Sequence, residues 1–87
     1  MEQELDVSPL EPPEPLERIL DTLADMPQGD WLRVKHRRDP VPLYRVLQNM
    51  GYRWHTDCLA PGRYEILIWP EDMPPPEGIL GTDPDRP

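Results

Sequence analysis

The feature that most constrains the fold is a unit that occurs twice, in residues 5–23 and again in residues 32–50. In each copy a short stretch with strand character precedes a Pro-x-Pro sequence, and apolar residues at helical spacing follow the prolines. Aligned at an offset of 27, the copies share seven identities: Leu5/Leu32, Val7/Val34, Pro13/Pro40, Pro15/Pro42, Leu16/Leu43, Arg18/Arg45 and Leu20/Leu47. Two strand–turn–helix units under the same packing rules account for this likeness, so duplication is not required.

Two amphipathic helices are indicated by apolar stripes with i, i+3, i+4, i+7 spacing. The stripes consist of Leu16, Ile19, Leu20 and Leu23 in the first copy and Leu43, Val46, Leu47 and Met50 in the second. Proline suits the first helical turn, where the backbone N–H has no partner, so each Pro-x-Pro marks a helix start. We expect the first helix to end near Met26 and the second at Gly51, with Asp39 as the N-cap of the second.

Four stretches have strand character, and with the helices they give the order β-α-β-α-β-β. They are residues 5–7, 31–37, 52–59 and 63–69. A right-handed crossover makes the first two strands parallel, and a short turn at Ala60-Pro61-Gly62 makes the last two an antiparallel hairpin. The sequence therefore predicts an α+β two-layer sandwich, in which both helices cover one face of a four-stranded mixed sheet and leave the other face open.

The folded domain is expected to span residues 4–69, with residues 1–3 and 70–87 disordered. Residues 70–87 hold six prolines and five acids, and their apolar surface is too small to offset the entropy of ordering. No apolar run approaches the roughly 18 residues needed to cross a bilayer, and the N-terminus lacks the regions of a signal peptide. We expect a cytoplasmic monomer that does not bind membranes.

One cysteine and two histidines limit the metal and redox chemistry. A single cysteine excludes an internal disulfide. Cys58 and His55 are three positions apart, which puts them on opposite faces of a regular strand, so they cannot chelate one ion together. We expect no metal site, no cofactor, and a buried Cys58 of low reactivity.

The net charge of −8 is unevenly distributed. Residues 1–30 carry −8, residues 31–69 carry +4 and residues 70–87 carry −4. The overall charge repels nucleic acid and anionic membranes, but the basic centre is able to attract an anion or an acidic partner. A solvated sheet face explains the same charges equally well.

Several motifs, in the right order, resemble the TusA/SirA-like domains. The run LDVSPLEPPEPL, residues 5–16, is similar to the start of those domains. The stretch DPVPLY (residues 39–44), then Gly51-Tyr52 and Pro61-Gly62-Arg63, is similar to one branch, the domain of unknown function 2249 family. The resemblance covers residues 4–69 and implies the same β-α-β-α-β-β sandwich.

The chain departs from these families at two positions. The sulfur-carrier members have a Cys-Pro-x-Pro motif whose cysteine accepts a persulfide, whereas the matching stretch here is Pro12-Pro13-Glu14-Pro15. Proline has no nucleophile, and this helix start lacks the N–H groups that stabilise a thiolate. Members of the 2249 branch place a histidine before the Asp-Pro of the second helix, where this chain has Arg38. We therefore expect no enzymatic activity.

The candidate site lies in the loops that follow the first two strands, because ligands of parallel β-α units bind beyond the carboxyl ends of the strands. The candidate binding residues are Ser8, Glu11, Arg33, Lys35, His36, Arg37, Arg38 and Arg53. Of these, His36 is best able to change its charge near neutral pH. The favoured function is a non-catalytic module that binds an unknown protein partner or a small anion. Pairing of Arg37 and Arg38 with the chain's own acids explains the same loop.

Two other function classes remain open. In a protein of sulfur or redox metabolism, Cys58 would carry the sulfur. In a nucleic-acid binder, the open face would provide a cationic stacking platform, although the overall charge argues against it. That platform would comprise Trp31, Arg33, Lys35, Arg37, Arg53 and Trp69.

Overall fold

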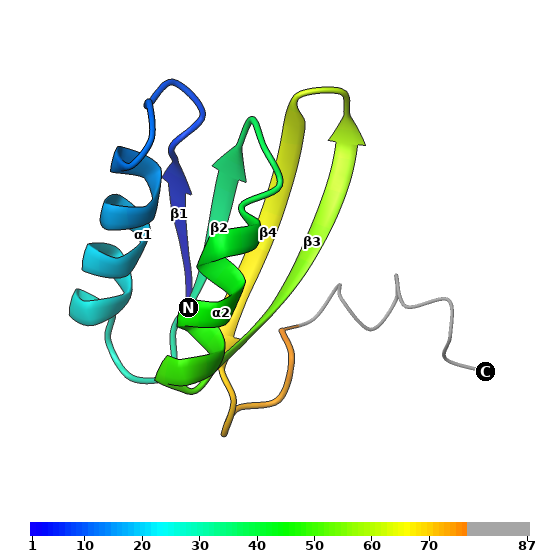
Figure 1. Cartoon of the computed structure of the whole chain (residues 1–87). Coiled ribbons are helices and arrows are strands. Elements are labelled where there is room, and N and C mark those ends of the chain that lie inside the picture. The colour runs from blue at the N-terminus through cyan, green and yellow to red at the C-terminus, as the bar shows by residue number, and fades with distance from the viewer. Residues whose placement is uncertain (77–87) are drawn as a thin grey trace.

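The computed structural model describes residues 1–76, and its elements follow the predicted order. They are β1 (Glu2–Asp6), α1 (Glu14–Asp25), β2 (Trp31–His36), α2 (Val41–Met50), β3 (Tyr52–Ala60) and β4 (Arg63–Pro70) (Figure 1). Residues 77–87, which make up most of the expected disordered tail, lie outside the described residues.

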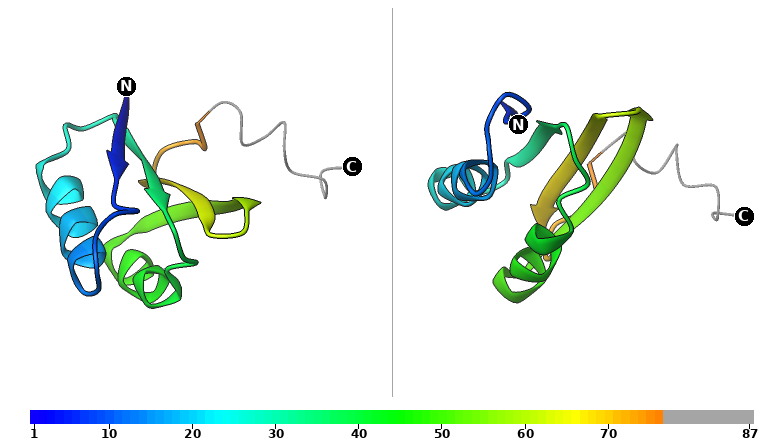
Figure 2. Two further views of the ribbon diagram at one scale, coloured as in Figure 1. Left: turned by 90° about the horizontal axis from the view of Figure 1, so that it is seen from above. Right: turned by 45° about the horizontal axis from the view of Figure 1, so that its top comes forward.

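The sheet has four strands in the order β1-β2-β4-β3. β1 runs parallel to β2, and β4 is antiparallel to both β2 and β3. The two helices lie on the same side of this sheet, as the view from above shows (Figure 2). The predicted α+β two-layer sandwich with a mixed sheet is therefore confirmed, and β1 and β3 are the two edges of the sheet.

The hydrophobic core fills the space between the helices and the sheet. Its fully or almost fully buried members are Val7, Ile19, Leu23, Leu32, Val34, Leu43, Leu47, Ile66 and Ile68. Alternate residues of a strand point to one face, which is why β2 and β4 each contribute every second residue to this layer. Burying an aliphatic side chain of this size stabilises the fold by about 1.5–3 kcal/mol. Within residues 1–76, neither helix has the length and apolar run required to span a membrane.

Only the C-terminal end of α2 matches the prediction. Gly51 closes the helix in the left-handed conformation, with φ of 84°, which a residue with a Cβ adopts only under strain. At the other end, Asp39 is not the N-cap: Pro40 occupies that position, and no side chain caps the helix. The Asp39 carboxylate instead accepts a hydrogen bond of 2.6 Å from the Tyr44 hydroxyl, five residues further along the chain.

The expectation that residues 1–3 are disordered is wrong, because β1 begins at Glu2. The N-terminal amine lies 3.0 Å from Asp30 Oδ1, and the Gln3 amide donates to Asp30 Oδ2 at 2.9 Å. These contacts hold the first residues beside the start of β2. The apolar pattern missed this part of the strand because Glu2 and Glu4 both face solvent.

Candidate functional site

The loops after β1 and β2 lie side by side, as the parallel pairing predicts. The backbone N–H of Val7 donates to the carbonyl of Lys35 at 2.9 Å. The Arg37 guanidinium lies 3.0 Å from the Glu11 carboxylate, so an ion pair joins the two loops. Arg37 is therefore paired with one of the chain's own acids. This agrees, for Arg37, with the alternative in which the basic residues of the loop pair within the chain.

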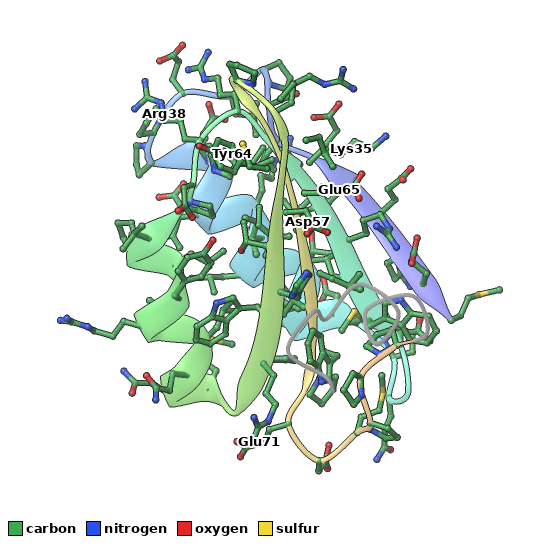
Figure 3. The ribbon with its side chains drawn as sticks, turned by 90° about the vertical axis from the view of Figure 1, so that its right-hand side faces the viewer. Lys35, Arg38, Asp57, Tyr64, Glu65 and Glu71 are labelled. Carbon is green, nitrogen blue, oxygen red and sulfur yellow. The ribbon has the colours of Figure 1, made fainter. Side chains whose placement is uncertain are left out.

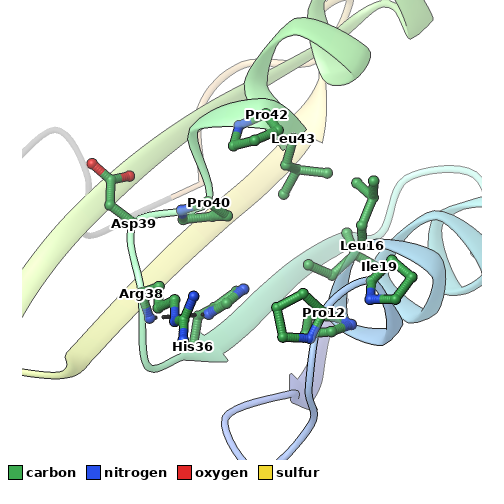
Figure 4. Close-up of a pocket in the computed structure, with 11 residues that line it drawn as sticks. Pro12, Leu16, Ile19, His36, Arg38, Asp39, Pro40, Pro42 and Leu43 are labelled. Atoms are coloured by element: carbon green, nitrogen blue, oxygen red, sulfur yellow. Dashed lines mark hydrogen bonds between the residues drawn. The ribbon is translucent and has the colours of Figure 1, made fainter.

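A cavity of about 380 Å³ opens between the starts of the two helices (Figure 4). This volume is in the range of small-molecule sites, and the position lies beyond the carboxyl end of β2. Its lining comes from both helix starts and from the end of β2. The lining residues are Pro12, Pro13, Pro15, Leu16, Ile19, His36, Arg38, Asp39, Pro40, Pro42 and Leu43.

Proline explains why the walls of this cavity are apolar. The two Pro-x-Pro sequences that begin α1 and α2 face each other across the cavity (Figure 4). Free N–H groups normally make a helix start polar and attractive to anions, but a proline ring has no N–H to offer. Any hydrogen bond to a ligand here must therefore come chiefly from side chains, and the polar ones in the lining are His36, Arg38 and Asp39.

His36 is the buried polar group of the cavity, with 9% of its surface exposed. Its burial, followed by the charges of Arg37 and Arg38, lowers the pKa of the imidazole below its ordinary value, although Asp39 opposes the shift. The backbone N–H of Arg38 donates to Nδ1 of His36 at 3.1 Å. Since Nδ1 accepts, the neutral ring carries its proton on Nε2. Among residues 1–76, the only hydrogen bond of the His36 ring is the one at Nδ1, so Nε2 has no partner there.

Arg38 and Asp39 differ in whether their charged groups already have a partner within the described part of the chain. In the described part of the chain, no carboxylate lies within 4.0 Å of the Arg38 guanidinium, which is exposed beside the cavity. The Asp39 carboxylate is bonded to Tyr44 and points away from the other lining side chains (Figure 4). The charge available to a ligand in this cavity is therefore positive.

Tyr44 connects Asp39 to the sheet. Its hydroxyl lies 2.6 Å from Asp39 Oδ1 and 2.5 Å from Thr56 Oγ1, and its ring stacks on Trp54 with centroids 5.1 Å apart. Burial and the hydrogen bond to Asp39 raise the pKa of Tyr44 to about 12. Tyr44 therefore fixes the carboxylate of Asp39 on the β3 side of the loop.

The structure separates the eight sequence-predicted site residues, and only His36 and Arg38 line the cavity. Ser8 belongs to a different, polar cavity beside Lys35 and Arg63. Both the hydroxyl and the N–H of Ser8 donate to Asp6 Oδ1, and these bonds lower the pKa of Asp6. Glu11 and Arg37 pair with each other. The remaining three, Arg33, Lys35 and Arg53, lie on the sheet face opposite the helices.

That sheet face is not the cationic stacking platform that was considered for nucleic acid. Arg33 lies between two acids, 2.9 Å from Glu2 and 2.7 Å from Glu65, and Glu2 is the main cause of the raised pKa of Arg33. Lys35 lies 3.8 Å from Glu4. Trp69, one of the two expected stacking rings, is only 5% exposed. Figure 3 shows Lys35 beside Glu65 on this face, so acids interrupt the basic surface.

Cys58 is exposed, which corrects the expectation of a buried thiol. It lies on the helix side of β3, next to a bulge between Cys58 and Ala60. Neither helix covers this end of β3 (Figure 1). Its thiol is 3.6 Å from the carbonyl of Ala60. In residues 1–76, no group of three or more potential metal ligands comes together.

Sequence reasoning missed the residues that form the walls of the cavity. Pro40, Pro42, Leu16 and Leu43 were interpreted only as helix-start and core positions. The available signal was the repeat itself, because two Pro-x-Pro helix starts that follow two parallel strands lie at the same end of the sheet.

The fold and this cavity define a small α+β sandwich domain with a ligand-sized space between its two helix starts. Within that class, the chain belongs to the family described as "Uncharacterized conserved protein (DUF2249)", whose model matches residues 4–70. The predicted family membership is thereby confirmed, while the wider relation to the TusA/SirA-like domains stays a prediction. No curated protein and no solved structure matches the chain.

Proposed function

We propose that this protein is a non-catalytic binding module for a small organic anion, and that the cavity between the helix starts is its site. One observation carries the proposal. The walls of the cavity are apolar, whereas the two uncommitted polar groups of its described lining, His36 Nε2 and the Arg38 guanidinium, come from one loop. A ligand that fits has a compact apolar body and a single carboxylate head.

The two polar groups supply complementary parts of the recognition. The Nε2–H of a neutral His36 donates one hydrogen bond to a carboxylate oxygen, and this donor is fixed because Arg38 N–H occupies Nδ1. The Arg38 guanidinium supplies the charge and is able to bind a carboxylate through two parallel hydrogen bonds. The proline and leucine walls bury the apolar body of the ligand, which stabilises the complex by about 25 cal/mol per Å².

The lining also supports binding over covalent chemistry. It contains no serine, threonine, cysteine or lysine in the part of the chain that the structure describes, so no hydroxyl, thiol or amine nucleophile lines the cavity. His36 lacks the second acid or base that would complete a proton-transfer pair with it, because Asp39 is turned to Tyr44. These features favour a site that holds its ligand unchanged.

An NMR titration of the ¹⁵N-labelled protein tests the proposal. The probes are isovalerate, hexanoate and benzoate, and the expected result is saturable shifts of the amides around His36, Arg38 and Leu43. Arg38→Gln should weaken carboxylate binding about tenfold, because a charge-assisted hydrogen bond is lost. The matched control is Arg45→Gln, which removes an exposed arginine on α2 outside the cavity.

Two results would contradict the proposal. The first is the absence of saturable shifts with every probe. The second is binding that Arg38→Gln and Arg45→Gln affect equally, because the cavity would then not be the site. If the protein binds acidic peptides but shows no response to the small acids, its partner is a protein and not a small ligand.

The exposure of Cys58 favours a second candidate, a sulfur carrier that uses this thiol. The Cys58 thiolate would attack the outer sulfur of a persulfide donor, R–S–SH, and the S–S bond of the donor would break. The products would be Cys58–S–SH and the thiolate R–S⁻, which takes up the proton that Cys58 has released. Mass spectrometry after incubation with glutathione persulfide tests this candidate: a gain of one sulfur atom, absent in Cys58→Ser, supports it, and an unmodified chain contradicts it.

A further inference from the structure

We propose that the protein forms a two-fold symmetric dimer through the outer edge of β3, with His55 at the symmetry axis. The expectation of a monomer rested on the sequence alone. The dimer involves a different part of the molecule from the cavity, so it is independent of the proposed ligand. Three features of β3 support it.

The first feature is an unpaired edge. β3 is nine residues long and ends the strand order, and among residues 1–76 it pairs with β4 alone. Figure 3 looks onto this edge, with β3 in front of the sheet. An edge strand presents a row of free N–H and C=O groups that can pair with another strand. β3 contains neither proline nor lysine, which commonly protect such edges.

The backbone of β3 shows which groups are turned outward. Glu71 N–H donates to the Gly51 carbonyl at 2.9 Å, on the β4 side, and Pro70, which has no N–H, is opposite Tyr52. Hydrogen-bonded and non-hydrogen-bonded pairs alternate along an antiparallel ladder, so Tyr52, Trp54 and Thr56 turn their N–H and C=O groups away from β4. An axis at His55 pairs Trp54 of each copy with the partner's Thr56, and all four groups of each such pair are then satisfied.

The second feature is a charge pattern that complements itself. Arg53 and Asp57 are each two residues from His55 and lie on the same sheet face. In an antiparallel pairing centred on His55, Arg53 is opposite the partner's Asp57, and Asp57 is opposite the partner's Arg53. These are non-hydrogen-bonded positions, where side chains come closest across the ladder. Opposite charges therefore meet twice, and like charges do not meet at these positions.

The other edge of the sheet has the reverse character. β1 has five residues, and Glu2, Glu4 and Asp6 all lie on its solvent face. Two copies of this strand would bring acids together, which disfavours self-pairing. The partner is therefore placed at β3.

The third feature is a pair of exposed apolar side chains at the two ends of the β3 edge. Met50 is 45% exposed and Leu59 is 56% exposed. The same register brings Leu59 beside the partner's Gly51 and close to the partner's Met50, and the symmetry repeats the contact. A dimer would bury apolar surface at both ends of its ladder, while the bulge after Cys58 limits the regular pairing to the residues between.

Sedimentation equilibrium of the full chain over a range of concentrations tests the dimer with four variants. Arg53→Asp and Asp57→Arg each replace two attractive pairs by two repulsive ones, and each should raise the dimer dissociation constant about tenfold or more. The double variant Arg53→Asp/Asp57→Arg reverses every pair and should restore dimerisation. Arg63→Asp, an exposed charge reversal in neighbouring β4, is the matched control and should leave the dissociation constant unchanged.

The outcomes separate clearly. Weaker dimerisation in both single variants, with recovery of dimerisation in the double variant, supports the proposed register. A native chain that stays monomeric at millimolar concentration overturns the proposal, as does a dimer that neither single reversal weakens. Circular dichroism of each variant shows whether the exposed substitutions have left the fold intact.

Discussion

The backbone N–H of Arg38 donates to Nδ1 of His36 at 3.1 Å, and this bond decides which nitrogen of the imidazole faces outward as a donor. Protonation of His36 would place a second proton at Nδ1 and break the bond. The loop geometry and the buried position of the ring therefore act in the same direction, and both favour the neutral form.

Stability should fall in mild acid because of His36. Its folded pKa is lowered, chiefly by burial and then by Arg37 and Arg38, so the unfolded chain binds the proton more tightly. The contribution is fully present above the unfolded pKa of roughly 6.5 and is lost as pH falls from there toward the folded pKa. Urea unfolding of the native chain and of His36→Asn, measured between neutral pH and pH 5, checks this.

Asparagine is the appropriate replacement because its side-chain oxygen can still accept from Arg38 N–H, yet it does not titrate. The native and variant curves of unfolding free energy should converge or cross as pH falls. Parallel curves over this window would show that His36 keeps its ordinary pKa in the fold. His36→Leu, which removes the acceptor as well, should be less stable than His36→Asn at neutral pH.

Removing the Tyr44 hydroxyl should loosen the loop that carries Arg38 and Asp39. Tyr44→Phe keeps the stacked ring over Trp54 but leaves Asp39 and Thr56 without their shared partner. The expected loss of unfolding free energy is about 1–2 kcal/mol, measured by urea unfolding at neutral pH. Trp54 fluorescence should change little, since the stack remains, and a large change would contradict this assignment of roles.

The same hydroxyl gives a prediction at high pH. The pKa of Tyr44 is raised to about 12, first by burial and then by the bond to Asp39. Because the folded pKa is raised, the neutral phenol stabilises the fold below the unfolded value of roughly 10, and this contribution is lost as pH rises toward 12. Absorbance at the phenolate band should show a late step in the native protein that Tyr44→Phe removes. An unchanged titration in Tyr44→Phe would contradict the assignment of the late step to Tyr44.

Gly51→Ala should destabilise the chain through backbone conformation alone. The glycine has φ of 84°, and a Cβ added there would meet nothing closer than Glu71 Oε2 at 3.6 Å, so space is not the problem. The expected cost is about 1–2 kcal/mol in unfolding free energy, measured by thermal or urea unfolding. Gly51→Asn should cost less, since asparagine tolerates this region better. Equal losses in the two variants would point to a side-chain clash instead.

Arg33→Gln tests whether the basic residues on the sheet face opposite the helices are paired with acids. Glu2 and Glu65 lose their shared cation, and the pKa of Glu2, now lowered mainly by its hydrogen bond with Arg33, should return toward its ordinary value. An NMR titration of the Glu2 side chain measures the change. High salt should reduce the difference between the native chain and the variant. Tight oligonucleotide binding by the native chain at low salt would contradict this description of the face.

Local patterns were enough to predict the fold. The stripe of Leu43 and Leu47, the Pro-x-Pro helix starts and the stop at Gly51 each depend on residues near one another in the chain, and short-range physics acts on them directly. The start of β1 was missed for a different reason. Glu2 and Glu4 carry no apolar signal, and their place in the sheet depends on Arg33 and Lys35, about thirty residues away.

The site could be predicted only in part. The topology predicted a site beyond β2, and His36 and Arg38 line a cavity found there, whose role as a binding site stays a prediction. Whether each basic residue is free depends on which acid lies beside it in space. Arg37 meets Glu11 and Arg33 meets Glu65, while no such partner for Arg38 lies in the described residues. Spacing in the chain does not reveal these pairings, nor does it show that Cys58 lies beyond the cover of the helices.

The facing prolines at the two helix starts also bear on how such a domain can diversify. Because they frame the opening with rings that neither donate protons nor change charge, the proposed recognition of a ligand depends on positions 36 and 38. Neither side chain belongs to the hydrophobic core cluster, so the proline frame does not depend on them. Under the proposed function, the scaffold acquires a new chemical preference through very few mutations.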